Sequence, residues 1–244
     1  MQVKNVARTL EGSRRSSKLG DGLAKDKIEK ARQLTPEQRL FVALELADAT
    51  AALQRACSKQ EALTKILSRL DAAHHRRLLH GYALIGGFAV SAWEVPRATQ
   101  DIDFAIAIGA ADPQALAIFL GGHFEAGDAD DPLRGVVHTS IQVGSTSVPL
   151  QLIFFPSAYT EVAFQHIESL SIMEQVVPVV SWQALVLKLY AGGPQDKLDA
   201  QQILQVRRPQ PDDLKQIGEK AKSLGILQDW TSALSLYQRK LSDL

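Results

Sequence analysis

Two aspartates separated by a single residue, Asp101 and Asp103, are the side chains best suited to chemistry in this chain. They open an apolar segment, residues 101–108, that we expect to form a β-strand. Because side chains alternate between the faces of a strand, both carboxylates should share one face, where they repel each other unless a cation neutralises them. Carboxylates and substrate phosphates together suit Mg²⁺, and Mn²⁺ has similar ligand preferences. The spacing therefore predicts a metal-phosphate site.

A pair of glycines, Gly86 and Gly87, ends an apolar run and precedes the aspartates by the length of a short helix. Glycine has no Cβ and tolerates positive φ, so such a turn lets another group approach the backbone closely, and we expect that group to be phosphate. Taken singly, a Gly-Gly turn also fits tight packing, and an Asp-x-Asp pair also fits a solvated strand edge. The ordered combination is what favours a site.

The combination of a hydrophobic strand, Gly-Gly, a short helix and Arg97-x-Thr99-x-Asp101-Ile102-Asp103 resembles the nucleotidyltransferase superfamily of DNA-polymerase-β-like fold. The resemblance runs from about residue 80 to residue 204. It is closest to small bacterial members related to the toxin half of AbiE-type abortive-infection systems (AbiEii-like toxins).

This resemblance implies Mg-dependent transfer of a nucleoside monophosphate from a nucleoside triphosphate to a tRNA, another RNA or a protein. It also implies the role of a toxin held in check by an antitoxin partner. Lys188, on a helix similar to the lysine helix of the family, can meet triphosphate charge or can lie over the core with its amine in solvent. The implied catalytic and metal-binding residues are Asp101 and Asp103, and the implied nucleotide-binding residues are Gly86, Gly87, Arg97, Thr99 and Lys188.

Two positions depart from the family pattern: Gly193 stands where the family often has arginine, and the main departure concerns a carboxylate. Where such enzymes usually carry a third carboxylate before a Leu-Ile pair, this chain has Gln151. An amide can coordinate through oxygen, but it brings no negative charge and cannot take a proton from an attacking hydroxyl. Two interpretations stay open: a working transferase that tolerates glutamine, or a catalytically inactive nucleotidyltransferase-fold protein that binds a nucleotide or a partner.

The elements that must position these residues predict an α+β fold, with a small mixed sheet around the acidic strand and helices before and after it. Apolar, β-rich segments flank Gly144-Ser145, a two-residue hairpin signal. Asp112 followed by proline predicts the start of a helix, and Gly121 predicts its end. The expected strands after that helix cover 136–143, 146–155, 168–173 and 175–180.

The N-terminal part predicts two helices rather than catalytic structure. Thr35-Pro36 and Ser58 each begin a pattern typical of a helix N-terminus, so we expect one helix to end near Cys57 and the next to begin there. Their apolar stripes suit packing on the sheet or a partner-binding arm. We divide the chain into a flexible tail (1–24), a helical region (25–79), a nucleotidyltransferase-like core (80–180) and a C-terminal helical region (181–244).

Composition limits the remaining classes. The 27 basic and 27 acidic residues cancel, so global charge does not indicate nucleic acid binding. The single cysteine excludes an internal disulfide, and no Cys/His set has the sequence spacing of a zinc site. Without a signal peptide or an apolar run of transmembrane length, we expect a cytoplasmic protein with no membrane partner.

Overall fold

The structure, a computed structural model, describes residues 49–97, 99–128 and 131–242. The predicted tail and the predicted helix start at Thr35-Pro36 lie outside these residues. The strands are β1 (Gly81–Ile85), β2 (Ile102–Ala107), β3 (His123–Ala126), β4 (Gly135–Val143), β5 (Thr146–Phe154), β6 (Ile167–Ile172) and β7 (Gln175–Val180). The helices are α3 (Ala49–His75), α4 (Gly86–Ala92), α5 (Pro113–Leu120), α6 (Ser157–Gln165), α7 (Trp182–Leu187), α8 (Pro194–Arg207), α9 (Pro211–Ser223) and α10 (Leu227–Ser242), with a 3₁₀ turn over Lys188–Ala191.

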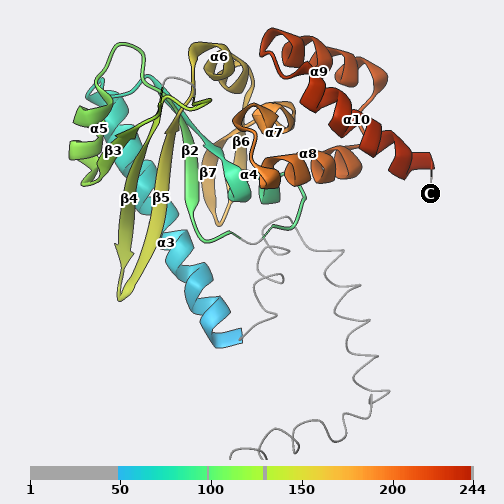
Figure 1. Cartoon of the computed structure of the whole chain (residues 1–244). Coiled ribbons are helices and arrows are strands. Elements are labelled where there is room, and N and C mark those ends of the chain that lie inside the picture. The colour runs from blue at the N-terminus through green and yellow to red at the C-terminus, as the bar shows by residue number, and fades with distance from the viewer. Residues whose placement is uncertain (1–48, 98, 129–130, 243–244) are drawn as a thin grey trace, which may run out of the picture.

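All seven strands form one mixed sheet in the order β3-β4-β5-β2-β1-β7-β6 (Figure 1). The acidic strand β2 lies in the middle, antiparallel to β1 and parallel to β5. Antiparallel pairs β3-β4-β5 and β6-β7 extend the two sides. The predicted α+β class with a mixed sheet is therefore confirmed.

Helix α3 lies across one face of the sheet and packs on β4 and β5 (Figure 1). On β4 the residues directed to this face, Val137, Ile141 and Val143, are buried. Their neighbours Ser140 and Gln142, which alternation places on the opposite face, are exposed. The second face of β4 is therefore open to solvent at these two positions.

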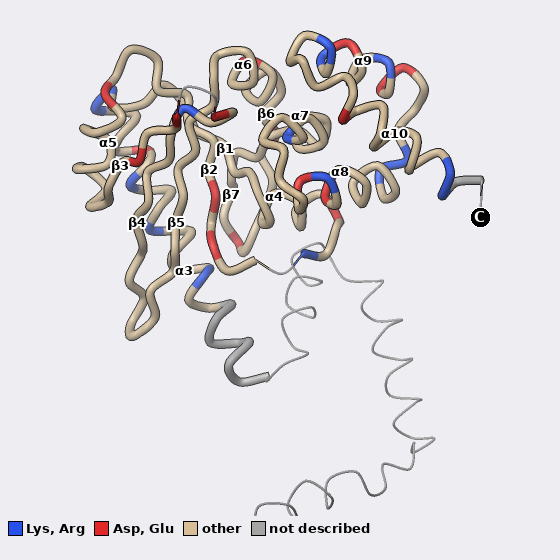
Figure 2. The backbone as a smooth tube through the Cα atoms, in the orientation of Figure 1, with Lys and Arg blue, Asp and Glu red and all other residues tan. Residues whose placement is uncertain are grey.

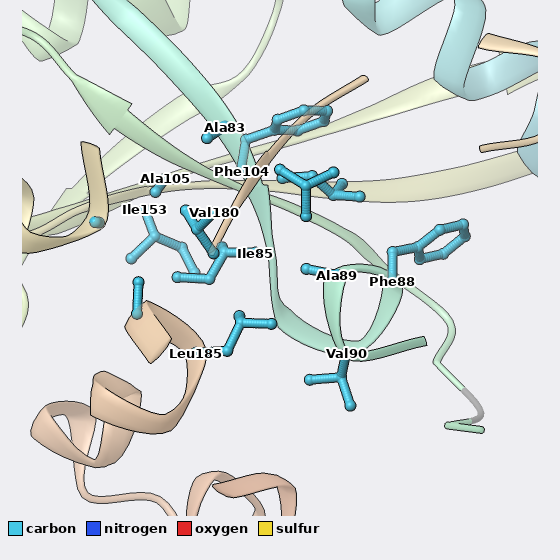
Figure 3. Packing of buried hydrophobic residues seen from close by; sticks show 14 of the residues in the cluster. Ala83, Ile85, Phe88, Ala89, Val90, Phe104, Ala105, Ile153, Val180 and Leu185 are labelled. Atoms are coloured by element: carbon cyan, nitrogen blue, oxygen red, sulfur yellow. The ribbon is translucent and has the colours of Figure 1, made fainter. Parts of the chain in front are cut away.

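The core beneath the site joins the central strands to α4 and α7. Figure 3 shows Ile85 of β1 and Val180 of β7 packed close to Leu185 of α7, with Phe88 on α4. All four side chains are at most 2% exposed. This packing fixes the end of β1, and with it the two glycines that begin α4.

The sequence signals for helix ends and hairpin turns were accurate where they depend on interactions within a few residues. Asp112 accepts a hydrogen bond from the Gln114 amide at 2.9 Å and caps α5, which ends at Gly121 with φ 71°. The hairpin across Gly144 and the pairs 168–173 and 175–180 are present within one residue of their expected bounds. No helix among the described residues is long and apolar enough to cross a membrane.

The predicted helix boundary at Cys57 and Ser58 is wrong. Helix α3 runs unbroken through both residues. Ser58 is 9% exposed and Lys59 is 8% exposed, so their helical turn is held by packing against the rest of the protein rather than opening a new helix. A capping-box pattern cannot distinguish a helix N-terminus from a polar residue that tertiary packing buries within a helix.

Candidate functional site

Asp103 lies on the central strand in register with both neighbours. Its Cα partner on β1 is Ile85, and its Cα partner on β5 is Gln151. The flanking residues Ile102 and Phe104 are fully buried on the other face, which confirms the predicted alternation. Asp103 itself is half-buried, as is Asp101 just before the strand. The two carboxylates therefore meet at the edge of the core.

The two glycines give room to side chains of the site. Gly86 has φ 70°, and a Cβ there would lie 2.1 Å from Oδ2 of Asp103. A Cβ on Gly87 would lie 2.6 Å from the Cβ of Thr99. Any larger residue would collide with one of these groups. The observed reason for glycine is close approach of Asp103 and Thr99, and contact with phosphate stays a prediction.

Gln151 faces the aspartates, as the resemblance to the family pattern predicted. Its side-chain amide nitrogen Nε2 donates to Asp101 Oδ2 at 3.4 Å, a long contact. A carboxylate at this position would place a third negative charge beside the first two. The amide instead supplies a donor to one carboxylate and leaves its own oxygen as a neutral acceptor.

The electrostatics of the site are unfavourable to the metal-free ionised state. Burial, and after it the negative charge of Asp101, raise the pKa of Asp103, while Lys188 and Arg97 lower it, and the net result is a pKa of about 6. Near neutral pH most of this carboxyl is nevertheless ionised. A divalent cation held between the two carboxylates would remove the repulsion and favour the ionised form.

Two acidic residues of helix α8 form ion pairs with the two cationic side chains that the sequence predicted to bind nucleotide. Arg97 pairs with Asp199 at 2.7 Å, and the amine of Lys188 pairs with Asp196. Gln195 donates a second hydrogen bond to Asp199, at 2.9 Å. In Figure 2, α8 carries both acidic and basic residues, and acidic residues lie on β2 and just before it.

These ion pairs are largely withdrawn from solvent. The Asp199 side chain is 5% exposed and the Lys188 side chain is 18% exposed. Burial raises the pKa of Asp199, whereas the Gln195 hydrogen bond and the Arg97 charge lower it. Lys188 is thus fixed by Asp196 rather than extending freely over the core, and it contributes to the potential at Asp103 from this position.

Lys59 is a component of the site that sequence analysis missed. From α3 its amine donates to the backbone carbonyl of Thr99 and lies 5.3 Å from the ring centroid of Phe88. Lys59 therefore ties α3 to the segment that contains Arg97 and Thr99 and leads into β2. The signal was present in the sequence, because Lys59 falls on the same helical stripe as Leu63, Ile66 and Leu70, where a lysine is unexpected.

The arrangement brings together Asp101, Asp103, Gln151, Gly86 and Thr99 at one end of the central strands, with Lys188 and Arg97 on its α8 side. The donor set of two carboxylates and an amide oxygen is what a hard cation such as Mg²⁺ prefers. Two adjacent cationic side chains suit a polyanionic ligand.

Comparison with known proteins adds a similarity of structure. No family model and no curated protein sequence matches the chain. Among solved structures, the chain is similar to the crystal structure of ANT(2")-Ia in complex with adenylyl-2"-tobramycin, with 18% sequence identity and a TM-score of 0.38. The match covers 71% of this chain and 97% of that one. A TM-score this low does not establish a common fold.

Proposed function

We propose that the protein is a metal-dependent nucleotidyltransferase, in which Asp101 and Asp103 hold Mg²⁺, or Mn²⁺, together with a nucleoside triphosphate. One observation carries this proposal: Asp103 stands half-buried on the central strand against Gly86, beside Asp101 and Gln151, in a place where its charge is costly without a cation. A bound divalent ion would neutralise triphosphate charge and orient the α-phosphorus. Thr99, Arg97 and Lys188 would contact the triphosphate, and Gly86 and Gly87 let the site close around it.

In such a transfer, an acceptor hydroxyl oxygen forms a bond to the α-phosphorus, pyrophosphate leaves, and the hydroxyl proton passes to a base. Gln151 cannot accept that proton. The Lys188 and Arg97 cations, which pair with Asp196 and Asp199 in the free protein, would stabilise negative charge on the transferred group once the phosphates displace these acids. We propose that the acceptor is an RNA, such as tRNA, or a protein. We also propose that the protein is a cytoplasmic toxin controlled by an antitoxin.

The second candidate is a nucleotide- or partner-binding protein without catalytic activity. The observation that favours it is Gln151, which occupies the strand position facing both aspartates and hydrogen-bonds one of them. In that case triphosphate and metal would bind, but no group would be transferred.

A transfer assay separates the two. The full chain is incubated with each α-labelled triphosphate, Mg²⁺ or Mn²⁺, and either total tRNA or total cell protein, and label in the acceptor is measured. Asp103→Asn should lose transfer, and Glu219→Gln, an exposed α9 variant, should retain it. Metal-dependent triphosphate binding without transfer would favour the second candidate. If Asp101→Asn and Asp103→Asn bind triphosphate with Mg²⁺ as tightly as wild type, both candidates are wrong about this site.

A further inference from the structure

Three potential ligands outside the acidic site gather at the edge of the sheet. His123 and Glu125 belong to β3, and His138 belongs to β4. One ligand atom from each residue lies within 4.8 Å of the other two. The two histidines are 15 positions apart in the sequence and no cysteine lies between them. This spacing does not match the sequence pattern of a zinc site.

Strand pairing explains why the three meet. His123 and His138 are direct Cα partners across the antiparallel pair β3-β4. Glu125 is two residues beyond His123, so alternation puts it on the same face of β3. Directly opposed residues in such a pair have Cβ atoms about 5 Å apart, within reach of two imidazoles that converge on one ion.

The distances need only small adjustments for a shared ion. With metal–nitrogen and metal–oxygen distances of about 2.1 Å, two ligand atoms of a tetrahedral ion lie about 3.4 Å apart. His138 Nε2 and Glu125 Oε2 are already 3.3 Å apart. The two imidazole rings are stacked with centroids 5.2 Å apart. Since the His138 side chain is 35% exposed and that of Glu125 is 72% exposed, rotation to close the remaining gap meets little packing.

From this geometry we propose that His123, Glu125 and His138 form a second metal site, which binds a borderline transition-metal ion such as Zn²⁺. Two imidazoles and one carboxylate are a ligand set that zinc proteins use, and they leave a coordination position open to solvent. Imidazole nitrogen suits Zn²⁺ far better than it suits Mg²⁺, which prefers oxygen. An ion here would fasten the short edge strand β3 to β4.

The site is separate from the acidic site, although both lie on one face. Strand register aligns Asp103, Gln151, His138 and His123 in one row across β2, β5, β4 and β3. With neighbouring strands about 4.8 Å apart, Asp103 and His123 are separated by about 14 Å. No single ion can bridge them, so the protein would carry two ions of different chemical class.

Calorimetric titration of the full, untagged, metal-depleted chain with Zn²⁺ tests the proposal. The background is Cys57→Ser with Asp103→Asn, which removes the exposed thiol and disables the acidic site. We expect one Zn²⁺ per chain. Because loss even of a residue that merely orients a zinc ligand weakens binding about 10- to 100-fold, His123→Ala or His138→Ala should weaken it by at least about tenfold. His166→Ala, which removes an exposed histidine outside the cluster, should leave the affinity unchanged.

Melting curves of the same proteins give an independent readout. Zn²⁺ should raise the melting temperature of the background and of His166→Ala, and excess Mg²⁺ should not replace it. Circular dichroism checks that each variant is folded. If the folded background binds Zn²⁺ no more tightly than His123→Ala and His138→Ala do, the proposal is wrong. Because the acidic site is disabled throughout, this result is independent of whether the protein transfers nucleotides.

Discussion

Replacing Asp103 by asparagine should stabilise the metal-free protein at neutral pH. The folded state raises the pKa of this carboxyl from 3.8 to about 6, mainly through burial and secondly through Asp101. A shift of about two pKa units corresponds to about 3 kcal/mol of differential free energy. This net shift already includes the attraction of the ionised carboxyl to Lys188 and Arg97, and uncharged asparagine resembles the protonated acid, so we expect a gain of about 1–3 kcal/mol in the free energy of unfolding at pH 7.

The pH dependence of this stability gain identifies the charge of Asp103 as its cause. Between pH 4 and 6 the folded state binds more protons at Asp103 than the unfolded state does, so wild-type stability falls as pH rises through this range. Above about pH 7, one unit beyond the folded-state pKa, the group is ionised in both states and the loss is constant. The advantage of Asp103→Asn should therefore be small near pH 4, grow up to about pH 7, and stay level above it.

Urea unfolding at constant ionic strength, from pH 4 to pH 8, measures this difference. Glu219→Gln, which removes an exposed acid, should show no such trend. With Mg²⁺ present, wild type should recover stability by mass action and Asp103→Asn should recover less. An advantage that is the same at pH 4 and pH 7, or a variant less stable than wild type at pH 7, would refute the reasoning.

Three other substitutions test the surroundings of this carboxyl. Gly86→Ala should cost at least about 1 kcal/mol in thermal or urea unfolding, because it combines positive φ with a collision against Asp103. Gln151→Asp should lower stability without metal, and Mg²⁺ should raise its melting temperature more than that of wild type; equal shifts would contradict the observed facing of Gln151 and Asp101. Lys59→Met should cost about 1–3 kcal/mol by removing a charged hydrogen bond, and should weaken triphosphate binding; unchanged values for both would show that Lys59 does not anchor the Thr99 segment.

Predictions from the sequence succeeded where the determining interactions lie within a few residues. The cap at Asp112, the stop at Gly121 and the turn at Gly144 each depend on local backbone chemistry, and each is present. The short edge strand β3 was not predicted, because its four residues carry no strong alternation and it forms by pairing with β4.

Side chains that meet through strand register were predictable only with help from a known pattern. Gln151 was placed beside the aspartates by resemblance, and the structure confirms that placement. His123 and His138 had no such guide, since nothing in their sequence spacing indicates that they oppose each other. Lys59 was missed for a different reason: a helix brings its cation to a loop that is 40 residues away in the sequence.

The collision between position 86 and Asp103 constrains the order in which the chain can evolve. Every side chain larger than glycine at 86 meets the carboxylate, so loss of the acid would remove this collision, while the positive φ of 70° would still favour glycine. At neutral pH the acid, in turn, lowers the stability of the protein when no cation is bound. A lineage released from selection for ion binding would gain stability by losing Asp103 first, and a substitution of Gly86 would then cost less.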